Sequence, residues 1–252
     1  MWREIEEKKR RLDALRPLAA RSLAVLDAWY DVELTYTSNA IEGNTLTRSE
    51  TAIVLEKGIT VAGRPLKDYY EVVDHFDAVR FVRELAKQGR PVGEDDVCRI
   101  HAIVLTKSNP AEAGIYSQHQ GRIRGSPVIF PSPVKIPRGM AAFGAWLEQQ
   151  SPSPQAAFEG HYRLVSVHPF SDVNGRTARL LMNLLLLRGG YPPSVIGPEH
   201  RQPYLTGLEA AQLGRGKEAY EAFLAGRLDS SLTDYLEHLG KELEAREERP
   251  SP

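Results

Sequence analysis

His168-Pro-Phe-Ser-Asp-Val-Asn-Gly-Arg-Thr-Ala-Arg179 places a histidine, an acid, an amide, a glycine and two arginines between two strongly apolar segments. The flanking segments, about 155–167 and 176–188, carry apolar residues at helical spacing and are expected to be helices. The polar stretch is therefore expected to be a loop that ends at a helix N-terminus. Unpaired backbone N–H groups and the positive end of the helix dipole make such a terminus a site for anions.

The side chains of this loop suit phosphate chemistry. Gly175 allows the backbone to approach a phosphate closely. Arg176 and Arg179 lie three residues apart on one face of the predicted helix, where their guanidinium groups suit further phosphates. Asp172 is a hard oxygen ligand of the kind that holds Mg²⁺ shared with phosphates, and His168 is a residue type that accepts a hydroxyl proton at neutral pH. Together these groups predict attack of a hydroxyl on a metal-bound polyphosphate.

Each of these residues alone has a simpler explanation. His168 could be a buried histidine with satisfied hydrogen bonds, and Asp172 and Asn174 could be helix caps. Arg176 and Arg179 could form a solvated face. Taken together, the simpler explanations are less convincing, because all these groups converge within one loop at the start of a helix.

The remainder of the chain predicts an all-α fold with one small β insertion. A helix is expected from about 20 to 43, because Gly43 tolerates the left-handed conformation that often follows a helix. Residues 114–134 are rich in glycine, proline and β-branched residues and predict a β-hairpin. No internal repeat is visible.

Composition narrows the class of protein. The chain has 252 residues, 32 basic and 33 acidic side chains, and 42% hydrophobic residues, which is typical of a globular core domain with a helical extension. Near-zero net charge gives no case for general nucleic-acid or membrane binding. Cys98 is the only cysteine, which excludes an internal disulfide and a cysteine-based zinc site. The chain starts without an apolar signal core, and the aliphatic stretch near Leu180–Leu187 is far too short to span a membrane, so a cytoplasmic protein is expected.

The stretch from His168 to Arg179 resembles the signature of the Fic family, H-P-F-x-[D/E]-G-N-G-R-x-x-R, with Val173 at a position that is usually glycine. The resemblance extends from about Thr35 to Gln212. It implies a Fic-type helical bundle with a β-hairpin flap at about 114–134. It also implies a nucleotidyltransferase that moves AMP from Mg-ATP to a hydroxyl on a target protein. If the loop needs a positive φ at Val173, a β-branched residue is strained there, and rate or nucleotide preference could change.

The resemblance also implies a role for each matching residue. His168 would be the general base, Asp172 the ligand of Mg²⁺ or Mn²⁺, and Arg179 the partner of the γ-phosphate. The other nucleotide-binding positions would be Asn174, Gly175 and Arg176 around the α- and β-phosphates, Val173 beside them, and Tyr204 and Gln212 near the adenine. For Tyr204 and Gln212, a packing role and a surface role are equally good explanations. The flap would pair with an extended segment of the target and place its Ser, Thr or Tyr hydroxyl.

A second motif, Ser38-Asn-Ala-Ile-Glu42-Gly43, resembles the Fic inhibitory motif, [S/T]-x-x-x-E-[G/N]. Ser38 and Glu42 are four residues apart, hence on one helical face, and the dipole at the helix end favours pairing of Glu42 with a cation. The resemblance implies that Glu42 pairs with Arg179, occupies the γ-phosphate site and places the chain in the class with an N-terminal inhibitory helix. From the spacing alone, a surface residue near a helix end is the preferred explanation for Glu42, and the inhibitory role is preferred only in combination with the downstream signature.

The sequence predicts three parts. Residues 1–90 form a helical region with the inhibitory helix at about 20–43, residues 91–225 a Fic core with the flap and the catalytic loop 168–179, and residues 226–252 a C-terminal helix and tail. The function expected first is an autoinhibited protein adenylyltransferase with ATP as substrate. Alternatives are a hydrolase that removes AMP, a transferase with another nucleotide donor, and a non-catalytic regulatory module. Assembly into a homo-oligomer is left open.

Overall fold

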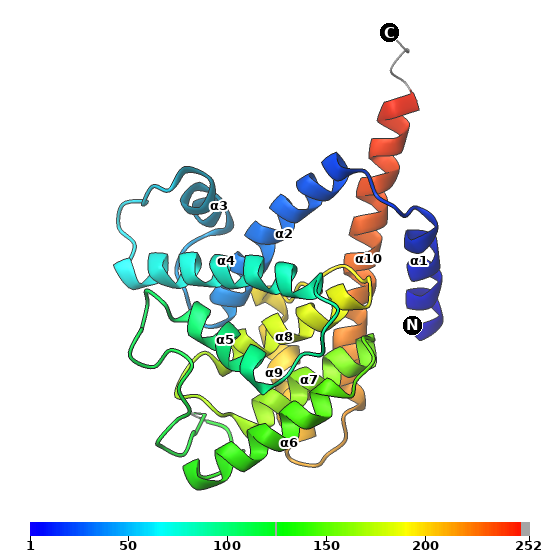
Figure 1. Ribbon diagram of the computed structural model, residues 1–252. Coiled ribbons are helices and arrows are strands. Elements are labelled where there is room, and N and C mark those ends of the chain that lie inside the picture. The colour runs from blue at the N-terminus through cyan, green and yellow to red at the C-terminus, as the bar shows by residue number, and fades with distance from the viewer. Residues whose placement is uncertain (124, 248–252) are drawn as a thin grey trace.

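Helices carry almost all of the regular structure in this protein (Figure 1). The computed structural model describes residues 1–123 and 125–247, with side chains described as far as Lys241. The α-helices are α1 (Trp2–Ala14), α2 (Ala20–Ile41), α3 (Arg48–Lys57), α4 (Leu66–Ala86), α5 (Glu94–Val104), α6 (Ile136–Glu148), α7 (Pro154–Val167), α8 (Asn174–Arg188), α9 (Arg201–Gln212) and α10 (Glu218–Glu247). Two short 3-10 helices, η1 (Pro133–Lys135) and η2 (Pro198–His200), precede α6 and α9. The predicted all-α class is confirmed.

The helix expected at 20–43 is present as α2, and Gly43 follows its end with a φ of +96°. The C-terminal helix differs from expectation, because α10 begins at Glu218. Leu224, Leu228 and Leu232 recur at four-residue steps and are fully buried, which explains the additional turns. The predicted boundary between residues 225 and 226 thus falls inside α10, and the predicted tail at 248–252 lies outside the described residues.

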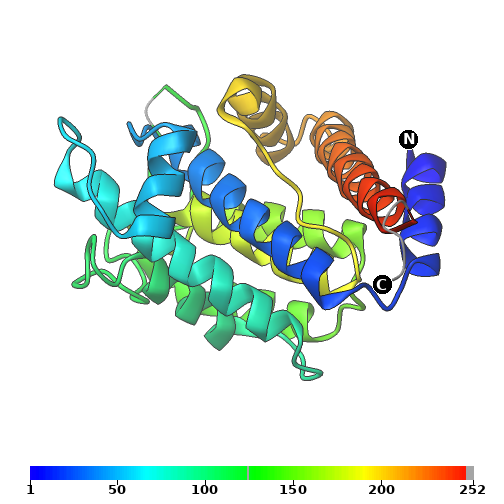
Figure 2. The same ribbon diagram turned by 90° about the horizontal axis from the view of Figure 1, so that it is seen from above.

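Helix α8 occupies the centre of the molecule. It packs on α7, α4, α5 and α2, and α2 lies along α4 (Figures 1 and 2). Nearly every residue of α8 from Thr177 to Leu186 is buried. The loop that precedes α8 is therefore built on the most deeply buried helix of the fold. Despite this apolar helix, none of the helices in the described part of the chain is long and apolar enough to cross a membrane.

Helix α1 packs against α10, so the first and the last helix lie side by side (Figures 1 and 2). Lys8 of α1 donates to the Asp229 carboxylate at 2.7 Å and to the Thr233 hydroxyl at 2.7 Å. One hydrophobic core cluster extends from Ile5 in α1 to Leu239 in α10. The helices other than α3 thus share a continuous core, and Val54 of α3 belongs to a second cluster with Leu46, Tyr69 and Val72.

The β-hairpin predicted for residues 114–134 is not seen. The described residues of this segment contain no strand, and its antiparallel contact is an isolated bridge between Tyr116 and Phe170. Prolines at 127, 131 and 133 lack the N–H that a strand ladder needs. The two limbs are instead joined by a side chain, because Gln120 Nε2 donates to the Phe130 carbonyl at 2.7 Å. We keep the name flap for this irregular segment.

Candidate active site

The loop between α7 and α8 has a left-handed backbone at both ends. His168, which ends α7, has a φ of +49°, and Val173, which precedes α8, has a φ of +51°. Non-glycine residues are uncommon in this region, and a β-branched residue there is strained. Such strain persists where the surrounding structure fixes the backbone. Val173 therefore has the positive φ under which the sequence analysis expected a strained backbone.

The side chain of Asn174 closes the loop on itself. Its Oδ1 accepts from the Phe170 N–H at 3.0 Å and its Nδ2 donates to the Phe170 carbonyl at 2.7 Å. The backbone of Val173 is also fully engaged, because its N–H donates to Asp172 Oδ1 at 2.6 Å and its carbonyl accepts from Thr177 Oγ1 at 3.0 Å. These bonds hold the first turn of α8, whose N–H groups have no partner within the helix.

His101 of α5 supports the same loop, a role that no sequence motif indicated. Its Nδ1 accepts from the Gly114 N–H at 2.9 Å, so the ring proton lies on Nε2, which faces the Asp172 carbonyl at 3.3 Å. The ring stacks on Phe170 with 3.6 Å between the ring centroids. Burial lowers the pKa of His101 to about 4, so the ring is neutral near pH 7. His101 thereby joins the start of the flap to the loop.

His168 lies beneath the flap. Its ring stacks on Phe130 with 3.9 Å between the ring centroids, and a Cβ built on Gly121 would lie 2.9 Å from His168 Cδ2. Burial lowers the pKa of His168, and the Val165 carbonyl and the Asp172 and Glu42 carboxylates oppose that shift. The imidazole is therefore neutral near pH 7, which is the form that can accept a proton.

Glu42 and Arg179 are in contact. Arg179 Nη2 lies 2.8 Å from Glu42 Oε1, Arg179 Nε donates to Ser38 Oγ at 2.9 Å, and Nη2 also donates to the Ser38 carbonyl at 3.0 Å. Burial alone would lower the pKa of Arg179, but the Glu42 carboxylate raises it. A Cβ on Gly175 would lie 2.8 Å from Glu42 Oε1. A carboxylate of the chain thus sits at the N-terminus of α8, where the sequence predicts an anion.

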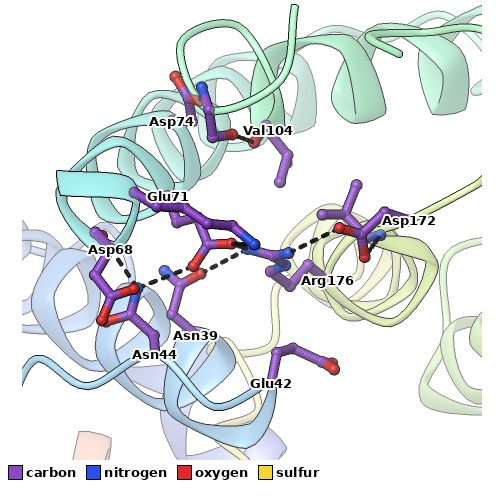
Figure 3. A network of polar contacts seen from close by, with 12 residues as sticks. Asn39, Glu42, Asn44, Asp68, Glu71, Asp74, Val104, Asp172 and Arg176 are labelled. Atoms are coloured by element: carbon purple, nitrogen blue, oxygen red, sulfur yellow. Dashed lines mark hydrogen bonds and ion pairs between the residues drawn. The ribbon is translucent and has the colours of Figure 1, made fainter. Parts of the chain in front are cut away.

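Arg176 and Arg179 are both buried and have different partners, so the two arginines do not form a solvated face. Arg176 Nη1 donates to Asn39 Oδ1 at 3.2 Å and lies 3.4 Å from Glu71 Oε1, while its Nη2 lies 4.0 Å from Asp172 Oδ2 (Figure 3). Neither Asn39 nor Glu71 carried a signal in the sequence. The loop, α2 and α4 meet at this guanidinium.

Asp172 is the exposed acid of the loop, with 61% of its side chain accessible. Its Oδ1 accepts from the Val173 N–H, and its Oδ2 lies 4.0 Å from Arg176 Nη2. No cluster of three histidine, cysteine or acidic side chains able to hold a metal occurs among the described residues. A single hard carboxylate fits a metal ion that takes its other ligands from phosphates and water.

Tyr204 and Gln212 lie on α9, in different surroundings. Tyr204 is buried, its hydroxyl is 2.7 Å from His161 Nε2, and burial raises its pKa. Gln212 is half-buried and its Nε2 donates to the Val165 carbonyl at 3.3 Å, close to the start of the catalytic loop. The geometry of Tyr204 matches the packing role that the sequence also allowed.

The chain is similar to proteins from animals and bacteria. The family model described as Fic/DOC family matches residues 91–186. Protein adenylyltransferase Fic of Nematostella vectensis is 37% identical over 85% of this chain and 51% of that protein, and protein adenylyltransferase fic-1 of Caenorhabditis elegans is 35% identical over 80% of this chain and 40% of that protein. The chain thus spans about half the length of such curated relatives.

Two solved structures share the fold over nearly the whole chain. A Fic-domain-containing signalling protein of Bacteroides thetaiotaomicron has a TM-score of 0.88 and 28% identity, with 94% of this chain and 97% of that chain covered. A fragment of Fic-1 of Caenorhabditis elegans has a TM-score of 0.84 and 30% identity, with 95% of this chain and 72% of that chain covered.

Proposed function

Because the chain belongs to the Fic/DOC family, we propose that it is an autoinhibited protein adenylyltransferase that moves AMP from ATP to a hydroxyl of a target protein. The observation that carries the proposal is the loop geometry. A neutral His168 stands at one end of the loop and the open N-terminus of α8 at the other, with Glu42 held there by Arg179.

In the proposed reaction the hydroxyl oxygen of the target attacks the α-phosphorus of ATP. The bond from that phosphorus to the bridging oxygen of the β-phosphate breaks, pyrophosphate leaves, and the hydroxyl proton passes to His168. The N–H groups of Asn174, Gly175 and Arg176 would stabilise the charge that develops on the phosphate oxygens. The left-handed turn at Val173 directs these groups toward one point.

A divalent cation fits this site. Asp172 would hold Mg²⁺ or Mn²⁺ together with the phosphates, because one carboxylate leaves most coordination positions to other oxygens. The cation would neutralise negative charge on the phosphates. Asp172 itself orients the Val173 N–H through its other oxygen.

We propose that Glu42 inhibits by competition for one arginine. With Glu42 bound, Arg179 is neutralised and a negative charge stands beside Gly175. A γ-phosphate would be repelled from that position, and the triphosphate would lie in a pose in which the α-phosphorus does not face the hydroxyl. Displacement of the carboxylate frees the guanidinium for the γ-phosphate.

The flap is proposed as the docking site of the target. A groove of about 480 Å³ is lined by residues 120–123 and 126–129, of which Ile123 and Ile129 are exposed. An extended segment laid along the flap would bring a Ser, Thr or Tyr hydroxyl over His168, which lies directly under Gly121.

The role of each of the three predicted parts of the chain is also a proposal. Residues 1–90 would restrain the site through α2, residues 91–225 would carry the chemistry, and residues 226–252 would complete the core. The family match that begins at residue 91 supports the first boundary. Placement of the adenine by Tyr204 and Gln212, a cytoplasmic location and the formation of a homo-oligomer stay predictions from the sequence.

Labelled ATP tests the proposal directly. Wild type, Glu42→Gly and Glu42→Gln are incubated with ATP labelled on the α-phosphate and Mg²⁺, and labelled sites are identified by mass spectrometry. We expect weak labelling of wild type, strong labelling of Glu42→Gly, and an intermediate level for Glu42→Gln, which keeps the shape but loses the charge. Absence of AMP from every product, with ATP bound, would refute adenylyl transfer.

Removal of AMP is a second candidate, favoured by the position of the Glu42 carboxylate. Its side chain is 39% exposed while one oxygen lies against Gly175, so it could hold a water molecule near a bound phosphodiester. Protein modified by the Glu42→Gly variant is incubated with wild type. Release of AMP by wild type, but not by Glu42→Gln, would assign this activity.

A further inference from the structure

Only the Nη1 end of the Arg176 guanidinium makes close polar contacts with described residues. Nη1 contacts Asn39 Oδ1 at 3.2 Å and Glu71 Oε1 at 3.4 Å, and Figure 3 shows both residues on the side opposite to Asp172. Within the described residues, Nε of Arg176 is buried and has no hydrogen-bond partner, and Nη2 approaches only Asp172, at 4.0 Å. The Nε–Nη2 edge is the edge that binds an oxyanion with two parallel hydrogen bonds. That edge is free and is turned toward the loop.

Glu71 is itself held rigidly. It comes from the second turn of α4, its side chain is only 11% exposed, and its Oε2 accepts from Asn44 Nδ2 at 3.1 Å. Asn44 in turn donates to the Asp68 carbonyl at 3.0 Å and accepts from the Leu46 N–H at 3.1 Å. The carboxylate therefore bridges Arg176 and the segment that follows α2, with one oxygen for each.

A buried guanidinium requires a compensating charge, and Glu71 supplies it on the face away from the loop. Asp172, the other acid near Arg176, is exposed and 4.0 Å away, so it compensates less. Glu71 thus does two things for Arg176: it lowers the cost of burying the charge and it fixes which edge of the guanidinium faces the loop.

We infer that Glu71 is a positioning residue that turns the Nε–Nη2 edge of Arg176 toward the phosphates of the nucleotide. The inference rests on the proposed binding of ATP at this loop. The Glu71 carboxylate also repels a phosphate, but the guanidinium lies between the two and screens that repulsion. Orientation is therefore expected to outweigh repulsion, and loss of Glu71 weakens phosphate binding.

The test compares a ligand that has phosphates with one that lacks them. Affinities for ATP and for adenosine, both with Mg²⁺, are measured by competition against a fluorescent ATP analogue for wild type, Glu71→Ala and Glu71→Gln. We expect Glu71→Ala to weaken ATP binding roughly tenfold with adenosine binding unchanged, since misplacing such a group by a fraction of an ångström is costly. Glu71→Gln, whose amide oxygen still accepts a hydrogen bond, should lose less.

Glu84→Gln is the matched control, because Glu84 lies on the same helix in an exposed pair with Lys87. Thermal unfolding of each variant reports whether it folds, and Glu71→Gln carries the test if Glu71→Ala does not. Equal losses for ATP and adenosine would mean a general packing role, and unchanged or tighter ATP binding would mean that Glu71 does not orient Arg176. Either result overturns the inference. If wild type binds neither ligand, the proposed function fails instead.

Discussion

Val173 is a buried β-branched residue with a φ of +51°. This combination predicts that its glycine variant is more stable than its alanine variant, the reverse of the usual order. A left-handed backbone costs a residue with a Cβ about 1–2 kcal/mol, and glycine escapes that cost. Val173→Ala loses buried methyl groups and keeps most of the strain, whereas Val173→Gly also loses the contacts of the Cβ but is relieved of the strain. We expect Val173→Gly to be more stable than Val173→Ala by about 1 kcal/mol in urea unfolding.

Transfer by Val173→Gly should equal or exceed that of wild type, because the loop stays closed by the hydrogen bonds between Asn174 and Phe170 and the Val173 carbonyl still accepts from Thr177 Oγ1. A folded Val173→Gly protein without activity would show that the valine side chain itself fits the donor nucleotide. Greater stability of Val173→Ala would show that the backbone is not strained at this position.

His168 is expected to be the proton acceptor, so His168→Ala should remove transfer and leave ATP binding nearly intact. Loss of a general base costs roughly 10²–10⁴ in rate. Burial lowers the pKa of His168 below its ordinary value of 6.5, so the neutral, active form persists as pH falls to 6.5 and is lost only at lower pH. Measured in the Glu42→Gly background, the acid limb of the rate profile should therefore lie below pH 6.5. Undiminished labelling by His168→Ala would remove this residue from the mechanism.

The functional residues of the loop could be recognised from the sequence, but the residues that contact them could not. His168, Asp172 and Arg179 stand out because a short polar stretch between apolar helices has few packing explanations. His101 and Glu71 did not stand out, because each is one polar residue on an amphipathic helix. Their contacts join residues 71 and 105 positions apart in the sequence, counted from Asp172 to His101 and from Arg176 to Glu71.

At the scale of the elements, the flap passes over the His168 imidazole at Gly121, a residue with no side chain. A Cβ on Gly121 would lie 2.9 Å from His168 Cδ2 and 3.5 Å from Phe130 Cδ2, so one of these groups would have to move. We expect Gly121→Ala to reduce transfer about tenfold or more, with ATP binding kept, because alignment at the reacting centre is lost. Labelling rate and ATP affinity measured together test this.

Gly89→Ala is the matched control, since a Cβ there would meet no heavy atom within 4 Å. If Gly121→Ala transfers AMP as fast as the Gly89→Ala control, the flap does not press on the imidazole during the reaction.

Helix α2 restrains Arg179 through its last turn, and a pair of variants separates this restraint from other effects of Glu42. Glu42→Gly should increase self-modification strongly, since correct alignment of a triphosphate is often worth ~10²-fold. Glu42→Gly/Arg179→Ala should lose most of that gain, because the carboxylate and the γ-phosphate compete for one guanidinium. Gel autoradiography of wild type and the two variants gives the comparison, and full activity of the double variant would contradict the competition.

The helices were predictable to within a few residues where apolar periodicity and capping agreed. Thr47 and Glu50 form a capping box, and Gly58 ends α3 with a φ of +64°, as their spacing indicates. The prediction that the flap is a β-hairpin was wrong, because the β-branched residues of this segment were given more weight than its prolines. The start of α10 was missed, although the leucines at four-residue steps begin at Leu224, upstream of the predicted boundary at residue 226.

For the molecule as a whole, the packing of α1 on α10 predicts that a residue far from the site contributes to global stability. Leu12 is fully buried, whereas Leu15 is 37% exposed on the same segment. Leu12→Ala should lower the free energy of unfolding by about 2–5 kcal/mol, and Leu15→Ala by much less. Denaturant unfolding measures both, and ATP affinity of the folded Leu12→Ala protein should be unchanged. Equal effects of the two substitutions would mean that α1 is not part of the cooperative core.

Three acceptors restrain Arg179, and they differ in how a mutation can remove them. The Ser38 carbonyl belongs to the backbone, so it is present whatever amino acid the codon at that position specifies. The Ser38 hydroxyl and the Glu42 carboxylate belong to side chains, and the carboxylate disappears with a single nucleotide change from a glutamate to a glycine codon. Natural selection can therefore remove the charged restraint in one step and restore it by the reverse step, while the backbone carbonyl stays in place.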